Sequence, residues 1–238
     1  MGQRGRVRLR MFGSCGIVTP LVAFTCTSLA ITLSPQFSWT DNALSDLGIV
    51  KGATSTFFNT GLILGGILAA MFGLGLFTIL EQNTLGKLGA ILFTLAAAAL
   101  TAIGIFPENA RPMHFYASVA FFILFPVAML LVGGSFLLLR KAKKGVLTLL
   151  AAAFAAAVWI AQFSIRYVPQ VAIPETLSSL SASAWSIFLG FEMFKEGATQ
   201  HHDIEPDHRP RQNELTSKSF ENMNSTIYRD RVFSKPYG

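Results

Sequence analysis

The chain has 238 residues, of which 52% are hydrophobic and only 13% are Asp, Glu, Lys or Arg. Soluble domains carry about 25% charged residues, so this composition excludes an ordinary water-soluble globule, a fibrous protein and a disordered chain. The formal net charge is +6, but the basic residues flank apolar segments and are not interleaved with aromatic residues. That placement argues against nucleic acid as a partner and for an integral membrane protein.

Six segments are each long and apolar enough to cross a bilayer as a helix, which takes about 20 mostly apolar residues. The sixth is the least apolar, because it is rich in serine and contains Glu192. Backbone groups in hydrocarbon must be hydrogen-bonded within the protein, so we predict an all-α fold, a polytopic transmembrane bundle of six helices. The segments are residues 11–33, 56–80, 88–106, 115–139, 146–165 and 177–194.

The basic residues predict the orientation of this bundle. If the N-terminus is inside, only Lys51, Arg111 and Arg166 of the membrane domain's basic residues lie outside, as the positive-inside rule requires. We therefore expect both termini to be cytoplasmic and the protein to be a multi-pass protein of the cell membrane. The expected parts are a basic N-terminal segment (1–10), a six-helix transmembrane domain (11–194) and a disordered cytoplasmic tail (195–238).

Small residues predict how the helices pack. Gly61 and Gly65 form a GxxxG pair in the second segment, and such pairs let helix backbones approach closely. Packing within the chain is the simpler interpretation, and a homo-oligomer joined through the same pair is the alternative. In the sixth segment Ser179, Ser183 and Ser186 recur on one helix face, which we expect to lie in the bundle interior.

The predicted outer loops hold most of the polar residues. In the first loop, Asp41 or Asn42 is expected to cap a short helix that Gly48 ends and that lies on the membrane surface. The second loop carries Glu108 and leads to His114, the only histidine before the tail. We expect an outward-facing polar cluster, consisting of Asp41, Asn59, Glu108, Arg111, Gln162 and Arg166.

One stretch of the first loop has a specific pattern. The string Phe37-Ser38-Trp39-Thr40-Asp41-Asn42-Ala43-Leu44-Ser45-Asp46-Leu47-Gly48 resembles the signature of a six-helix membrane family known as domain of unknown function 998. Phe58-Asn59 followed by Gly61, the Phe106-Pro107 pair and His114 are similar to its pattern too. The resemblance covers about residues 10–195 and implies six helices and an outward polar cluster, without an established activity. A looser similarity to six-helix families tied to GPI-lipid remodelling and autophagy favours lipid slightly.

Three hypotheses for the function follow. In the first, the polar cluster binds or handles a membrane lipid at the outer leaflet. Arg111 and Arg166 would hold an anionic headgroup, because guanidinium groups pair well with phosphate, and Asn59 and Gln162 would line the upper pocket. In the second, the protein is purely structural or binds a partner protein.

The third hypothesis is an outer-leaflet lipid hydrolase. His114 would act as the base, because the pKa of histidine suits proton transfer at neutral pH. Asp46 would orient it, and Ser45 or a bound water would attack. Alternatively, Asp46, Glu108 and His114 would hold a metal ion. We expect no cofactor.

Overall fold

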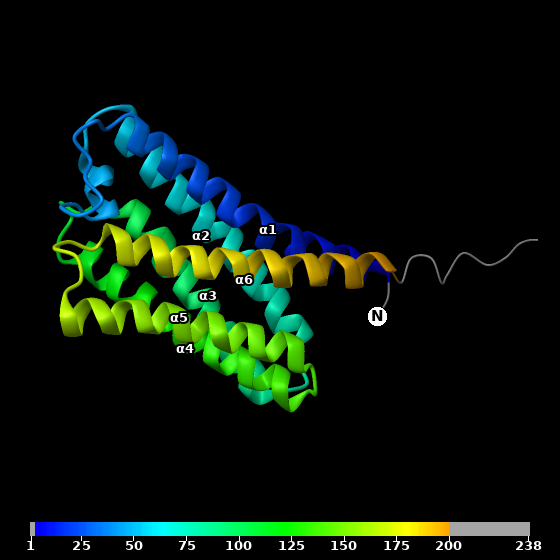
Figure 1. Cartoon of the computed structure of the whole chain (residues 1–238). Coiled ribbons are helices and arrows are strands. Elements are labelled where there is room, and N and C mark those ends of the chain that lie inside the picture. Colours follow the sequence, from blue (N-terminus) through cyan, green and yellow to red (C-terminus); the bar gives the residue numbers. More distant parts are fainter. Residues whose placement is uncertain (1–2, 200–238) are drawn as a thin grey trace, which may run out of the picture. The chain divides into compact units, whose positions relative to one another are not determined.

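The computed structural model describes residues 3–199, and within them the chain is helical and contains no strand (Figure 1). Five of these helices, α1 to α5, are long and apolar enough to cross a membrane, so this is a multi-pass membrane protein. The predicted tail lies outside the described residues from residue 200 onward. The helices are α1 (Gln3–Thr32), the short 3-10 helix η1 (Leu44–Ile49), α2 (Ala53–Ile79), α3 (Thr84–Ile105), α4 (Met113–Leu138), α5 (Ala142–Ile165) and α6 (Ala172–Thr199).

Successive long helices run in opposite directions, so their connections gather at two ends (Figure 1). We call the end with residues 33–52, 106–112 and 166–171 the loop end. The opposite end holds the start of α1, the turns at residues 80–83 and 139–141, and the last turns of α6, and we call it the basic end. The topology therefore brings all three predicted polar loops to one end of the bundle.

The first and last helices of the chain, α1 and α6, are longer than the segments predicted for them. Helix α1 begins at Gln3, eight residues before the segment at 11–33, and α6 continues to Thr199. The reason is tertiary packing, because these extensions lie against each other. A Cβ atom on Gly197 would come within 2.5 Å of Arg10 Cγ, and the Arg10 guanidinium lies 4.9 Å from the centre of the Phe194 ring.

Lysine and glutamate side chains also join α5 to α6 at the basic end. Lys144 Nζ lies 2.6 Å from Glu196 Oε1 and 3.4 Å from Glu192 Oε2. Glu192 is the carboxylate that lies within the sixth predicted segment and lowers its hydropathy. Its charge is compensated by Lys144, so it is not an isolated charge within an apolar segment.

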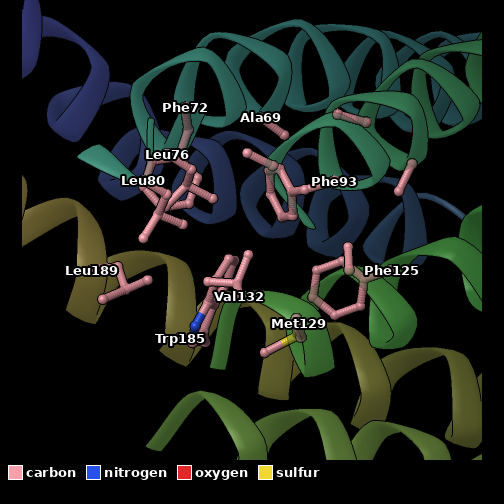
Figure 2. Packing of buried hydrophobic residues seen from close by; sticks show 14 of the residues in the cluster. Ala69, Phe72, Leu76, Leu80, Phe93, Phe125, Met129, Val132, Trp185 and Leu189 are labelled. Atoms are coloured by element: carbon pink, nitrogen blue, oxygen red, sulfur yellow. The ribbon is translucent and has the colours of Figure 1, made fainter. Parts of the chain in front are cut away.

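The core is formed by buried apolar side chains of several helices that pack against one another (Figure 2). Phe72 of α2, Phe93 of α3, Phe125 of α4 and Trp185 of α6 form a cluster of rings with centre-to-centre distances of 5.4 to 6.3 Å. Trp185 also donates its Nε1–H to Thr148 Oγ1 at 2.9 Å, which satisfies the polar edge of this buried ring.

Glycines set the closest helix contacts. Gly61 and Gly65 both face α1, where added Cβ atoms would meet Cys26 Cβ at 2.4 Å and Ala23 Cβ at 3.4 Å. The GxxxG face is thus used within the chain, and a homo-oligomer through it stays a prediction. Gly13 and Gly190 bring α1 and α6 together, since a Cβ on Gly13 would lie 2.5 Å from Gly190 O.

Candidate functional site

A cavity of about 390 Å³ lies within the bundle, a size typical of small-molecule sites. It extends along α6 from Glu175 to Ser186, about 16 Å at the helical rise. This is roughly half of the 30 Å hydrocarbon core of a bilayer. The predicted serine face of α6 is therefore in the interior, but it lines a cavity instead of a closely packed contact. The apolar lining residues are Pro20, Ala23, Phe24, Ile31, Trp39, Leu44, Phe58, Leu62, Ala69, Phe72, Phe93, Ala97, Leu100, Ile103, Phe121, Phe122, Phe125 and Ala182.

Hydroxyl groups supply most of the polar lining, chiefly from α1 and α6. Several already donate to backbone carbonyl groups of their own helix: Thr19 to Cys15, Thr32 to Ser28, Thr176 to Ala172 and Ser183 to Ser179, all at 2.7 to 2.9 Å. Because each hydroxyl proton is already donated to a carbonyl group, the hydroxyl oxygen presents its lone pairs to the cavity. The walls are therefore apolar with scattered hydrogen-bond acceptors.

Glu175 is the charged residue in the lining of this cavity, and it belongs to the first turn of α6, before the predicted crossing at 177–194. The backbone N–H of Leu44 donates to Glu175 Oε2 at 2.7 Å. Burial, together with repulsion from Glu108 and Asp46, raises the pKa of Glu175 from 4.5 to about 8, although the Leu44 hydrogen bond acts in the opposite direction. Glu175 is therefore mostly protonated at neutral pH.

The first loop covers the cavity at the loop end. Its backbone is joined to the loop before α6 by hydrogen bonds from Gln170 N–H to Thr40 O and from Ala172 N–H to Asn42 O, at 3.0 and 3.1 Å. The Ser45 hydroxyl of η1 donates to Glu108 Oε2 at 3.1 Å. All three loops are thus joined around η1, and Leu44 and Ser45 face the cavity.

The short helix predicted in the first loop is present, but its cap differs from the prediction. The helix follows Ala43 and ends after Gly48, at Ile49. Asp46 stabilises its start by accepting hydrogen bonds from the Ala43 N–H at 3.0 Å and from Asn42 Nδ2 at 2.8 Å. Asp46 therefore does the work expected of a cap residue from within the helix.

Asp41 lies outside the hydrogen-bonded cluster around η1. Its carboxylate accepts from Ser38 Oγ at 2.6 Å and from Thr40 Oγ1 at 2.8 Å. These bonds hold the pKa of Asp41 below its ordinary value. The residue organises its own exposed turn, and it does not line the cavity.

Asn59 and Gln162, predicted to line the upper pocket, instead bind backbone carbonyl groups of the loops. Asn59 Nδ2 donates to Gly48 O at 3.0 Å, and a Cβ atom on Gly48 would lie 2.7 Å from Asn59 Oδ1. The buried Gln162 Nε2 donates to Val168 O at 2.9 Å. Both amides position loops, and neither lies in the cavity lining.

The two arginines expected to hold a headgroup are exposed and do not face the cavity. The Arg111 side chain is 74% exposed and pairs with Glu108 Oε1 at 3.0 Å. Arg166 ends α5 with φ 45°, in the left-handed region. Its position is a helix C-cap, which glycine usually occupies.

His114 is buried, with 7% of its surface exposed. Its Nδ1 lies 2.8 Å from Phe106 O. A carbonyl oxygen only accepts, so Nδ1 carries the proton and Nε2 is free to accept. Nε2 lies 3.4 Å from Ser118 Oγ, one helical turn further along α4, and Ser118 lines the cavity.

The predicted group of Ser45, Asp46 and His114 is not joined by hydrogen bonds in residues 3–199. Ser45 donates to Glu108, Asp46 holds the start of η1, and His114 bonds to Phe106 and Ser118. Within the same residues, no group of three or more His, Cys, Asp or Glu side chains has the arrangement of a metal site. The predicted metal set of Asp46, Glu108 and His114 is thus not brought together.

Glu175 and Ser118 offer chemistry to the site, and neither was among the predicted site residues. Glu175 continues the Ser179, Ser183 and Ser186 face by one turn, and this periodicity was its signal in the sequence. Ser118 follows His114 by four residues, the spacing that places two side chains together on a helix.

Comparison with known proteins assigns the family. The family model described as protein of unknown function (DUF998) matches residues 17–192, most of the membrane domain. The chain belongs to this family. No curated protein and no solved structure matches the chain in the same comparisons. This DUF998 protein is thus a multi-pass membrane protein of unknown activity.

Proposed function

We propose that this protein crosses the membrane six times and binds one amphiphile in its internal cavity, entering from the outer leaflet. The observation that carries the proposal is the cavity itself, which is apolar along about half a bilayer thickness and has a carboxyl group at its loop end. An apolar chain can exchange lipid contacts for such walls at little cost in free energy, because both surroundings are apolar. Its headgroup then meets Glu175 and Ser45. The ligand therefore needs one long apolar part and one polar end.

The sixth crossing rests on α6. Residues 177–194 of this helix span about 27 Å, close to the hydrocarbon thickness of a bilayer. Its lower hydropathy comes largely from serines, of which Ser179, Ser183 and Ser186 face the cavity. Trp185, Leu189 and Met193 of the same helix are buried in the core.

The orientation rests on the clustered basic residues of the basic end, which we place in the cytoplasm of the cell by the positive-inside rule. Reporter fusions after residues 50, 110 and 170 are expected to report the outside, and fusions after residues 82 and 140 the cytoplasm. The opposite pattern would refute the outer-leaflet entry.

Binding of an amphiphile is tested with a variant whose larger side chain fills the cavity. Ser179→Trp places an indole in the lining, whereas Leu180→Trp, one residue further along α6, changes a side chain that is 49% exposed on the helix surface. Native mass spectrometry of the purified proteins is expected to find retained lipid on the wild type and Leu180→Trp, and much less on Ser179→Trp. Equal retention by both variants would refute a cavity ligand.

A second candidate function, ester hydrolysis, is favoured by Ser118 and His114. His114 Nε2 would take the Ser118 proton while Oγ attacks a carbonyl carbon in the cavity, and the proton would pass to the departing alkoxide. Water would then hydrolyse the acyl-Ser118 ester and release the acid. Here Ser118 replaces Ser45 as the nucleophile, and Phe106 O replaces Asp46 as the group that orients His114.

A fluorophosphonate probe tests this candidate. Labelling is expected on the wild type and on Ser45→Ala, and it should disappear in Ser118→Ala. If Ser118→Ala is labelled as strongly as the wild type, Ser118 is not a nucleophile. If the folded wild type is not labelled by the probe, ester hydrolysis by Ser118 is refuted as well. A purely structural or partner-binding role would then gain support.

A further inference from the structure

Three acidic side chains surround the polar end of the cavity. Glu175 lines the cavity, and the carboxylates of Asp46 on η1 and Glu108 in the α3–α4 loop act on it electrostatically. The basic residues of the neighbouring loops are turned outward. Arg111 is largely exposed and bonds to Glu108, and Arg166 is exposed at the end of α5.

No cation of residues 3–199 therefore bonds to Glu175 itself. Its recorded hydrogen-bond partner is the neutral Leu44 N–H. A buried carboxylate without a countercharge is destabilised, and an incoming cation would relieve that cost.

The rest of the lining also suits a cation. Aromatic rings attract cations at their faces, and the walls carry Trp39, Phe24, Phe58, Phe121 and Phe122. The hydroxyl groups that bond to their own helices present oxygen lone pairs, which favour a positive over a negative charge.

We propose that the amphiphile bound in the cavity carries a cationic headgroup, a substituted ammonium, which Glu175 neutralises. This inference rests on the proposed function and replaces the anionic headgroup expected from Arg111 and Arg166. The apolar chain would lie toward Phe72, Phe93 and Phe125. The ammonium would lie at the loop end, between Glu175 and the aromatic side chains.

Three photoreactive probes with the same alkyl chain test the proposal in lipid nanodiscs. One ends in trimethylammonium, one in a hydroxyl and one in a sulfonate, so that no probe changes its own charge with pH. Cross-linked residues are located by peptide mass spectrometry, with Ser179→Trp as the blocked control. We expect the trimethylammonium probe to label the cavity residues roughly tenfold or more strongly than the sulfonate probe.

Glu175→Gln should abolish this preference while keeping the labelling by the hydroxyl probe. The matched control is Glu81→Gln, which removes an exposed carboxylate between α2 and α3. This control should retain the full preference. In the wild type the preference should also increase from pH 6 to pH 9, as Glu175 loses its proton, and Glu175→Gln should show no such increase.

The outcomes separate the two proposals. Equal labelling by the cationic and anionic probes, or an unchanged preference in Glu175→Gln, overturns the cationic headgroup while the hydroxyl probe still supports an amphiphile cavity. Labelling of the wild-type cavity by none of the probes overturns the proposed function itself.

Discussion

The protonation of Glu175 predicts that the stability of this protein decreases as the pH rises through neutrality. The carboxyl group has a pKa of about 8 in the folded protein and 4.5 as an ordinary glutamate. The folded state therefore binds this proton more tightly than the unfolded state. Its stabilising effect is complete below about pH 4.5, decreases above that value and is lost once the pH exceeds about 8.

The magnitude follows from the two pKa values. Between pH 5.5 and pH 7.5 the unfolded group is mostly ionised and the folded group stays mostly protonated, so linkage predicts a loss of about 2–3 kcal/mol in the free energy of unfolding. This value is an upper limit, because Asp46 and Glu108 interact with the same proton. Glu175→Gln keeps an oxygen for the Leu44 N–H and carries no charge, so its stability should lack this part of the pH dependence.

The assay is reversible unfolding of the detergent-solubilised protein, measured at both pH values for the wild type and Glu175→Gln. The difference between the two proteins removes the contributions that other titrating groups make equally to both. At pH 7.5 the variant should match or exceed the wild type in stability. If the two proteins show the same pH dependence, Glu175 is ionised in the folded protein and the reasoning about its buried site is wrong.

Three further predictions test the packing around the site. Asn59→Ala removes the donor to Gly48 O and should lower the free energy of unfolding by about 1–3 kcal/mol, measured by chemical unfolding. An unchanged unfolding midpoint would mean that η1 does not depend on this amide. Arg166→Gly should raise the free energy of unfolding by up to about 1 kcal/mol, since φ 45° strains any residue with a Cβ atom. Arg166→Ala keeps a Cβ atom and should not raise it. If both variants change the thermal stability equally, the backbone at Arg166 is not strained. Gly13→Ala should weaken the contact between α1 and α6 and reduce the yield of folded protein in size-exclusion chromatography, because its Cβ atom would lie 2.5 Å from Gly190 O. The matched Gly65→Ala, whose Cβ atom has its nearest neighbour at 3.4 Å, should fold normally. Equal yields of the two variants would refute the close contact at Gly13.

The sequence by itself determined the membrane domain and its family. Long charge-poor segments leave helices as the available structure in a bilayer, and α1 to α5 occupy the first five of them. The signature at residues 37–48 indicated the family, and the positions of the three polar loops followed from alternating crossings. These features depend on hydrophobicity and periodicity, which local sequence contains.

Only the tertiary structure decided which polar residues form a site. Asn59 and Gln162 have the composition of pocket residues, but each has a loop carbonyl within reach and is used for folding. Glu175 becomes special because α6, η1 and the α3–α4 loop meet around it and partly enclose its carboxyl group at the end of the cavity. Burial and pairing depend on contacts between segments that are distant in the chain, and one sequence contains no measure of those distances.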